Sequence, residues 1–489
     1  MEIASFSKSA MPQTRIEVIS MPMDYGLPLS RSGKEQIYKE FLRDLQEMRP
    51  KGVGISCTAI AQAEETIRLC ELIKSYDPEI LVFLGGYFPT IYYEEIFSRT
   101  DAVDLIVRGE GELPALRIVD YIEKGRNPVS EHIPNLVWKK NGDLCLTKQE
   151  KPFDLKKKAT LDLSLLRLPR KYDVLPYAFS RGCPYRCDFC MEGLIRPVRR
   201  EVPTEIIRRD LDNLSRQSNA QTLLVSDALF TSFDKFSILK SLGMEINFET
   251  RCDVADPTAM SKIAEVCGIM AIGLESASYD TLRRMNKVKN KSHFENYISN
   301  ALALFREASK YEIPMMVFMI AGYPGDTEED LQDSVAFAAK LSEMGGPGGH
   351  VFKIGECRVY PKTKLHRVAS SMPDVVFDDQ GVFGDNIVRQ PSKSLDFEKV
   401  LSYMRQIFNL SHPTPKLETA LSKVMPLFRI PALSLNDPLI PDRCYRGEGR
   451  EILNVQGDSL SVLRSLVPQL KAKYKDLLSE VRQTRELRA

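Results

Sequence analysis

Short runs rich in β-branched residues alternate with helical stretches over the first part of the chain. The runs predict strands at residues 15–20, 52–56, 80–84 and 104–108, and the stretches between them predict helices at 36–48, about 61–75 and 92–98. Regular alternation of strands and helices is typical of a parallel sheet. We therefore expect residues 1–125 to form an α/β domain built on a parallel sheet.

Residues 126–172 lack this alternation and are expected to form a connector. Asn141-Gly142 stands between two short polar strands and predicts a β-hairpin turn. The basic run at residues 156–158 is expected to lie on the solvated surface.

A second series of strands begins after Asp173. Strands are expected at 174–180, 222–226, 245–250, 269–274, 315–321 and 351–359, each followed by a helical or turn segment. Six such repeats predict a partial β/α barrel over residues 173–372, and the active groups of these barrels gather at the carboxyl ends of the strands.

The last part of the chain, residues 373–489, is expected to be mainly helical. An amphipathic helix is predicted at 395–409, a proline-rich break at 411–415 with further prolines at 438 and 441, and a charged helix at about 459–487. This region is a candidate cover for the open side of the barrel.

Length and composition restrict the class of protein. A chain of 489 residues is expected to form two or three domains. Its 67 Lys and Arg nearly balance 66 Asp and Glu, which argues against nucleic acid or an anionic membrane as the main partner. There is no apolar run of about 18 residues, no basic-then-apolar leader at the N-terminus, and no disulfide-framework spacing among the ten cysteines. We expect a cytoplasmic enzyme.

Three closely spaced cysteines carry the strongest chemical signal. Cys183, Cys187 and Cys190 lie on a loop directly after the first barrel strand. A structural zinc site usually closes with a fourth ligand, but the next cysteines, Cys252 and Cys267, are distant and unpaired in spacing. A disulfide would leave one thiol over. The triplet therefore favours a 4Fe-4S cluster with one iron open to another ligand.

The Cys-x3-Cys-x2-Cys spacing, with Phe189 just before the last cysteine, resembles the signature of the radical S-adenosylmethionine (SAM) superfamily. The order of the barrel strands matches that superfamily over roughly residues 170–365. The resemblance implies an enzyme that cleaves SAM reductively at the cluster and removes hydrogen from a substrate carbon. It also implies a cellular reductant such as flavodoxin or ferredoxin.

Polar groups at the carboxyl ends of the barrel strands are candidates for holding SAM. Glu275 is placed to accept hydrogen bonds from the ribose or the ammonium group, and Arg251 to pair with the methionyl carboxylate. The alternative for both is a structural ion pair, and Asp227 is equally credible as a helix N-cap. The remaining candidates for SAM binding are Phe189, Ser276, Gly322 and Tyr323.

The ends of the N-terminal strands carry a second set of candidates. Ligands of parallel sheets bind outside the carboxyl ends of the strands, where Ser56, Thr58, Gly85, Gly86 and Gly109 fall. Glycine there lets a large ligand approach the backbone, but tight turns explain it equally well.

The segments Gly85-Gly-Tyr-Phe-Pro-Thr90 and Arg108-Gly-Glu-Gly-Glu112 resemble a Rossmann-like, cobalamin-binding-type domain that precedes the radical core in one branch of the superfamily. The resemblance adds Tyr87 and Glu110 as candidate contacts. Two departures stand out: Asp-x-His-x-x-Gly is missing and the domain is shortened. Cobalamin is therefore expected to bind without a protein histidine.

These resemblances imply methylation of an unactivated carbon of a small molecule or peptide. A radical cyclisation, rearrangement or elimination without cobalamin is the first alternative, and a non-catalytic iron-sulfur protein is the second. Plain thiols, rather than ligands of an auxiliary cluster, are expected at Cys252, Cys267, Cys357 and Cys444. Cys252 and Cys357 lie at barrel-strand ends, and Cys357 is a candidate for proton or hydrogen donation.

Overall fold

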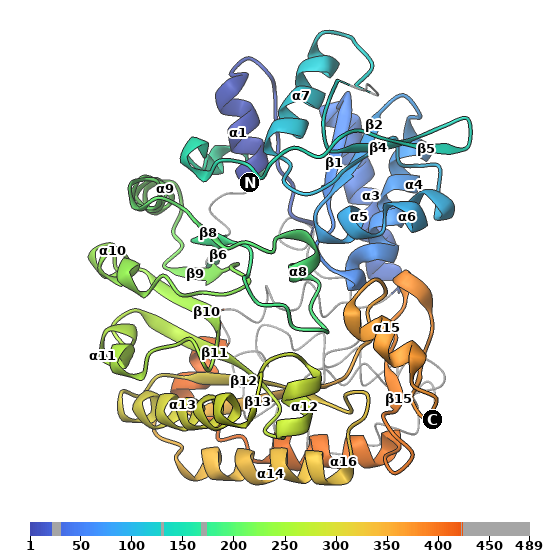
Figure 1. Cartoon of the computed structure of the whole chain (residues 1–489). Helices are drawn as coiled ribbons and strands as arrows, with labels where there is room; N and C mark the ends of the chain where they lie inside the picture. Colours follow the sequence, from blue (N-terminus) through green and yellow to red (C-terminus); the bar gives the residue numbers. More distant parts are fainter. Residues whose placement is uncertain (22–30, 129–131, 168–173, 422, 424–489) are drawn as a thin grey trace. The chain divides into compact units, whose positions relative to one another are not determined.

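The computed structural model describes residues 1–21, 31–128, 132–167, 174–421 and 423 (Figure 1). The chain divides into two compact units. The first comprises residues 1–173, 201–220 and 382–384, and the second comprises 174–200, 221–381 and 385–489. The predicted connector thus falls in the first unit, whereas the strand that begins at Val174 opens the second.

The first unit is built on a five-stranded sheet of order β1-β2-β3-β4-β5. Strands β1 (Gly52–Ser56), β2 (Leu81–Gly85) and β3 (Leu105–Val107) are parallel, as the sequence predicts. The predicted hairpin forms β4 (Leu136–Lys140) and β5 (Asp143–Leu146), which extend the sheet in the antiparallel sense. The hairpin joins the sheet because its apolar residues Leu136 and Trp138 pack with Leu105 and Val107 of β3.

Helices connect and flank these strands. The predicted helices at 36–48 and 61–75 are α3 (Arg31–Met48) and α4 (Ala63–Tyr76), and the helix expected at 92–98 is α6 (Tyr93–Arg99), preceded by α5 (Tyr87–Ile91). The other helices of this unit are α1 (Glu2–Ala10), α7 (Glu112–Glu123), α9 (Thr204–Gln217) and the 3-10 turns η1 (Ile60–Gln62), η2 (Leu155–Lys157) and η3 (Leu163–Leu165).

The strand expected at residues 15–20 does not form. Only Val18 makes a bridge, to Leu166, with its N–H 2.7 Å from the Leu165 carbonyl oxygen. The apolar residues Ile16 and Val18 are only half-buried. Strands are stabilised by packing of their side chains against neighbouring strands and helices. Because residues 15–20 bury little apolar surface, they do not form a strand of the sheet.

The prediction of a solvated lysine run is wrong for Lys158. Its ammonium group lies 2.6 Å from Asp210 Oδ2 and 3.1 Å from Glu2 Oε1, and its side chain is only 4% exposed. Lys156 and Lys157 are exposed as expected. The local sequence could not indicate this ion pair, because Asp210 lies on α9, 52 residues after Lys158.

The second unit is built on a six-stranded sheet of order β13-β12-β11-β10-β9-β6, in which all neighbours are parallel. The order along the sheet follows the order along the chain, which confirms the predicted partial barrel. The strands are β6 (Val174–Tyr177), β9 (Thr222–Val225), β10 (Glu245–Arg251), β11 (Cys267–Glu275), β12 (Met315–Ala321) and β13 (His350–Glu356). Short strands β14 (Val376–Phe377) and β15 (Val388–Gln390) form a separate antiparallel pair.

The two faces of this sheet differ. One face carries fully buried side chains such as Ile246, Phe248 and Phe352, and helices run along the outside of the sheet (Figure 1). On the other, inner face, Leu417 and Leu421 pack with Val174, Met316 and Val351, which lie near the amino-terminal ends of their strands.

The helices of the second unit follow the strands in sequence. They are α8 (Glu192–Ile195), α10 (Phe236–Ser241), α11 (Met260–Ile263), α12 (Tyr279–Arg284), α13 (Lys291–Lys310), α14 (Glu328–Glu343), α15 (Lys364–Ser371) and α16 (Phe397–Asn409), with 3-10 turns η5 (Phe233–Lys235) and η6 (Pro257–Ala259). Two-residue strands β7 (Ser180–Arg181) and β8 (Arg200–Glu201) and the turn η7 (Gly381–Phe383) complete the described elements.

The amphipathic helix expected at 395–409 is confirmed as α16, and the break is confirmed at 411–414, after which a helix runs from 415 to 421. The prolines at 438 and 441, Cys444 and the helix expected at 459–487 lie outside the described residues, so the proposed cover of the barrel stays a prediction. Among the helices that the structure describes, none has the length and apolar character needed to cross a membrane.

Candidate active site

The cysteine loop begins with a sharp turn that only glycine accommodates. Gly182 has φ +87°, and a Cβ on it would lie 2.3 Å from the Val198 carbonyl oxygen. The N–H of Cys183, the next residue, donates to the Arg196 carbonyl at 3.1 Å. The chain therefore leaves β7 and folds back on the segment after α8, which sets the position of the first cysteine.

The middle of the loop is tied to two other segments of the second unit. Asp188 donates its N–H to the Met285 carbonyl at 3.0 Å, and its carboxylate forms an ion pair with Lys364 at 2.8 Å. Asn286 Nδ2 donates to the Arg186 carbonyl at 2.7 Å. These contacts hold the second and third cysteines at the carboxyl-terminal side of the barrel sheet.

The three thiols form one electrostatic group. Burial raises the pKa of Cys187, while the nearby cations Lys287 and Arg251 lower it. Desolvation, together with the charges of Cys187 and Cys183, raises the pKa of Cys190 to about 11. A bound metal favours the thiolate, so the cationic residues and the metal act in the same direction.

No three His, Cys, Asp or Glu side chains in the described ranges meet the geometry of a single-ion site. This does not conflict with the three cysteines as ligands, because each thiolate of an iron-sulfur cluster binds a different iron and the sulfurs stand farther apart than the ligands of one ion. An all-thiolate donor set with adjacent cations fits such a cluster.

Arg251 lies at the carboxyl end of β10, beside the cysteine loop. Its Nε and Nη2 each donate to Asp253 at 2.8 Å, and Nη1 donates to Cys187 Sγ at 3.4 Å. The guanidinium also stacks 3.9 Å from the centre of the Tyr185 ring. Arg251 therefore forms an ion pair with Asp253, which was the structural alternative. Its pairing with the SAM carboxylate stays a prediction.

Glu275 ends β11 in a left-handed conformation, with φ +61°, at an irregularity in the pairing with β12. Its carboxylate forms a short ion pair with Lys287, which also donates to the Gly273 carbonyl at 2.9 Å. A non-glycine residue at positive φ is uncommon and occurs often at functional sites. Lys287 was not predicted, because it lies in a turn after α12 with no motif of its own.

Asp227 does not cap a helix, so that alternative is wrong. Its carboxylate accepts from the N–H of Phe179 at 2.7 Å and from the hydroxyl of Ser180, and thus joins the ends of β9 and β7. The N-cap positions of the following turn and helix are occupied by Ser232 and Lys235, and neither makes a capping hydrogen bond through its side chain. Burial raises the pKa of Asp227 to about 6, against the lowering effect of these hydrogen bonds.

The other candidates for SAM binding lie at the ends of β11 and β12 or on the loop. Ser276 Oγ is 3.2 Å from Ser334 Oγ, and Tyr323 is buried with its hydroxyl 3.4 Å from the Arg284 carbonyl. Gly322 has φ +73°, and Phe189 is half-buried on the cysteine loop. Contact of these four residues with SAM stays a prediction.

In the first unit, the ends of β1 and β2 meet as predicted. Ser56 pairs with Gly85, and the N–H of Cys57 donates to the Gly85 carbonyl at 2.9 Å. Gly86 has φ +103°, and a Cβ there would lie 2.4 Å from the Cys57 carbonyl oxygen. A tight turn therefore accounts for Gly86.

Gly85 and Gly109 differ from Gly86. A Cβ on either would meet no atom within 4 Å; Gly109, at φ +77°, still has a backbone conformation that favours glycine, whereas nothing in the surrounding protein requires glycine at Gly85. Thr90, which the sequence did not single out, links the two strand ends: its hydroxyl donates to the Gly86 carbonyl at 2.7 Å and accepts from the Gly109 N–H at 2.9 Å. An open backbone edge of this kind fits a large flat cofactor.

The remaining candidates flank this edge. Thr58 donates to the side chain of Gln62 at 3.0 Å through its N–H, Tyr87 is the first residue of α5, and Glu110 accepts from the Phe153 N–H at 2.7 Å. No histidine occurs in the chain before residue 132. This edge of the sheet could therefore contact cobalamin through backbone and hydroxyl groups, but not through a histidine.

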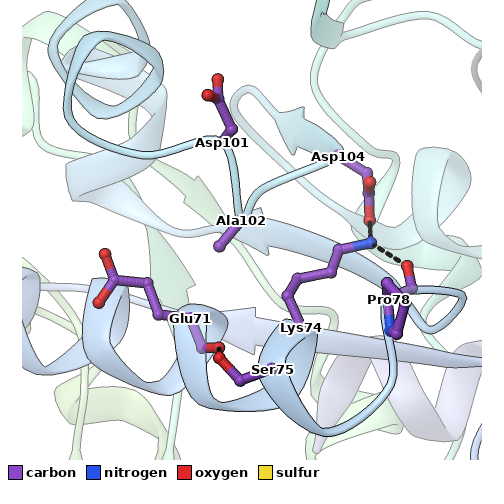
Figure 2. A pocket seen from close by; sticks show the side chains of 7 residues that line it. All are labelled: Glu71, Lys74, Ser75, Pro78, Asp101, Ala102 and Asp104. Carbon is purple, nitrogen blue, oxygen red and sulfur yellow. Dashed lines mark hydrogen bonds and ion pairs between the residues drawn. The ribbon is translucent and has the colours of Figure 1, made fainter.

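A surface depression of about 480 Å³ lies elsewhere on the first unit (Figure 2). It is lined by residues that precede β2 and β3, and it contains an ion pair of Lys74 and Asp104 at 2.7 Å. Ligands of parallel sheets bind at the carboxyl ends of strands, so this depression lies at the wrong end to be the cofactor site.

Comparison with known families agrees with the two sites. The B12 binding domain model matches residues 8–119, and the Radical SAM superfamily model matches residues 177–338. The chain is 26% identical to an uncharacterized methyltransferase, PH0819, of Pyrococcus horikoshii over 62% of this chain and 67% of that protein. It is 26% identical to the hopanoid C-3 methylase of Methylococcus capsulatus over 51% of this chain and 50% of that protein.

Solved structures agree on the fold. The cobalamin-dependent SAM radical enzyme OxsB superposes with a TM-score of 0.64 at 15% identity, covering 99% of this chain and 77% of that one. The radical SAM methyltransferase TsrM from Kitasatospora setae superposes with a TM-score of 0.56 at 16% identity, covering 89% and 86%. The chain spans about half the length of several curated relatives that it matches.

The barrel with its cysteine loop lies within the part of the chain that matches the Radical SAM superfamily model. The chain therefore combines a B12 binding domain with a Radical SAM domain. This pair of domains implies a 4Fe-4S cluster, SAM and cobalamin as cofactors.

Proposed function

We propose that this chain is a radical SAM enzyme that transfers a methyl group, with the help of cobalamin, to an unactivated carbon of a small molecule or peptide. The observation that carries the proposal is a cysteine loop held beside Arg251 and Lys287, in a chain that begins with a B12 binding domain. The proteins to which the chain is similar include some named as methylases or methyltransferases.

When bound, the cluster and SAM supply an adenosyl radical and cobalamin carries the methyl group, so the protein's part is to hold the reactants and exclude water. Arg251 and Lys287 place positive charge beside Cys187 and favour its thiolate. Lys287 also fixes the carboxylate of Glu275 at the end of β11, where it can accept hydrogen bonds from SAM.

The proposed partners are a substrate and a cellular reductant such as flavodoxin or ferredoxin. The described cysteines are all free thiols, which favours a reducing compartment, and we propose the cytoplasm.

Anaerobic reconstitution tests the proposal in two steps. After reduction, chromatography should detect 5′-deoxyadenosine and methionine formed from SAM; if neither forms, the chain is a non-catalytic iron-sulfur protein. The purified protein should also retain cobalamin with its visible absorbance, and isotope-labelled methyl should reach a product. A chain that cleaves SAM yet retains no cobalamin would rule out the methyl-transfer part.

A radical cyclisation is the second candidate. The observation that favours it is the similarity to the anaerobic magnesium-protoporphyrin IX monomethyl ester cyclase of Rubrivivax gelatinosus. The two sequences are 26% identical over 49% of this chain and 46% of that protein. Mass spectrometry of the product separates the two candidates, because methylation adds one carbon and cyclisation adds none.

A further inference from the structure

Glu249 occupies an unusual position in β10. Its neighbours Phe248 and Thr250 are buried on the outer face, at 2% and 5% exposure. Glu249 points to the inner face of the sheet and is exposed. Alternation along the strand places Asn247 and Arg251 on the same inner face. A carboxylate in the middle of a central barrel strand is therefore accessible from the interior side.

The other acidic groups near this face are paired, whereas Glu249 is not. Glu245 binds Lys423 at 3.0 Å, Asp253 binds Arg251, and Glu275 binds Lys287. Its backbone carbonyl accepts from the Phe230 N–H at 3.0 Å, but among the described residues its carboxylate has no hydrogen bond and no ion pair within 4 Å. A carboxylate in such a place is normally compensated by a cation.

The surface around Glu249 leaves room beside it. Ala271 is its neighbour in register on β11, and Gly355 on β13 would have no atom within 4 Å of a Cβ. Phe318 and Ile320 of β12 are half-buried and add an apolar wall. Lys353, whose ammonium group lies 5.6 Å from the centre of the Phe318 ring, is the nearby basic residue on this face.

The electrostatic environment is consistent with a missing cation. Although the side chain is accessible, the surrounding barrel walls desolvate its carboxylate and raise the pKa of Glu249; Lys353 lowers this pKa and Glu275 raises it. The ionised form is thus disfavoured by its surroundings, and an additional positive charge would stabilise it.

We propose that Glu249 anchors a protonated amine of the substrate, whose carbon skeleton lies along Phe318 and Ile320 on the inner face of the barrel sheet. This inference rests on the proposed function, since it names the substrate class of the same active site. It narrows the proposed substrate from any small molecule or peptide to a small molecule or peptide that carries a basic nitrogen. A charge-assisted hydrogen bond of this kind also fixes orientation, which hydrogen abstraction from one carbon requires.

The test uses the full chain reconstituted with its cofactors and three probes of one size. Phenethylamine is cationic, 2-phenylethanol neutral and 3-phenylpropionate anionic at pH 7.5. Calorimetry or ligand-observed magnetic resonance should show phenethylamine binding about ten-fold more tightly than either analogue, a difference typical of one charge-assisted hydrogen bond. Equal affinities for the three probes would overturn the proposal.

Glu249→Gln should abolish the preference for phenethylamine. Glu245→Gln is the matched control, because it lies on the same strand and face but binds Lys423; it should keep the preference. Glu249→Asp should weaken the preference without removing it, and cluster absorbance checks the folding of each variant. A preference that persists in Glu249→Gln would also overturn the proposal.

The outcome is separable from the proposed function. SAM cleavage and cobalamin retention by the unaltered chain test the enzyme class and do not depend on the amine. Enzyme activity without any amine preference would refute the anchor alone, whereas an amine preference without SAM cleavage would refute the enzyme class alone.

Discussion

The two units present the carboxyl ends of parallel strands in different ways. In the first unit the edge is formed by Gly85, Gly86 and Gly109, joined through one hydroxyl, that of Thr90. In the second unit the edge is crowded with paired charges, such as Arg251 with Asp253 and Glu275 with Lys287. The first edge suits a large cofactor that needs open backbone, and the second suits thiolates and a charged cosubstrate that need compensation.

The largest effect should follow from changing the cysteine loop. Cys187→Ala removes a cluster ligand, so we expect loss of the visible iron-sulfur absorbance and of 5′-deoxyadenosine formation. Cys267→Ala is the control, because Cys267 is buried at the start of β11 and should leave both intact. Cluster retention in Cys187→Ala would contradict the assignment.

The charged edge should be sensitive to the loss of one partner of a pair. Lys287→Met leaves Glu275 without its cation, and we expect the free energy of unfolding to fall by about 3 kcal/mol. Denaturant titration of the reconstituted chain measures it. Lys289→Met, an exposed neighbour, should change little, and Glu275→Gln added to Lys287→Met should recover part of the loss.

The glycine edge should be sensitive to backbone shape instead. Gly86→Ala forces a side chain into φ +103° and against the Cys57 carbonyl, so we expect destabilisation of about 2–4 kcal/mol. Thermal unfolding followed by circular dichroism provides the measurement. A melting temperature equal to that of the unaltered chain would show that the turn is not required.

A pH effect separates the second unit from the first. Because the pKa of Asp227 is raised to about 6 from an ordinary value of 3.8, the folded state binds this proton more tightly than the unfolded state between those values. Stability from this group is therefore highest at low pH and declines as pH rises towards 6, by up to about 3 kcal/mol. Asp227→Asn should lack this decline when melting temperatures are compared between pH 4.5 and 7.

The smallest effect on stability should come from Gly85→Ala. No atom lies within 4 Å of the added Cβ, so the free energy of unfolding should change by less than about 1 kcal/mol. Cobalamin retention should nevertheless fall, because the methyl group occupies the open edge. Unchanged cobalamin content in Gly85→Ala would mean that the cofactor does not approach this backbone.

Much of the fold was predictable because its signals are local. Strands β1, β2, β10 and β12 were placed to within a residue or so, since each is an apolar run bounded by breakers. The strand expected at 15–20 failed because its side chains bury too little against the sheet. The hairpin was predicted, but not its place beside β3, which depends on apolar packing between distant segments.

The candidate site divides in the same way. The cysteines were evident from spacing alone, and the glycines from their position after strands. Lys287, Thr90 and the buried Lys158 were missed because each acts on a residue that local patterns do not connect to it. The helix-cap alternative for Asp227 failed because the groups that donate to its carboxylate, the Phe179 N–H and the Ser180 hydroxyl, lie 48 and 47 residues earlier in the chain.

The sequence by itself determined the ligand loop, the order of strands and helices, and the resemblance to two known domains, because these depend on residue type and short spacing. Tertiary structure alone decided which charges are compensated, and which glycines form a tight turn and which border open space. It also decided that the Glu249 carboxylate faces the inner side of the barrel sheet without a partner among the described residues. The physical reason is that burial and charge pairing arise between segments distant in the chain, where no local pattern records them.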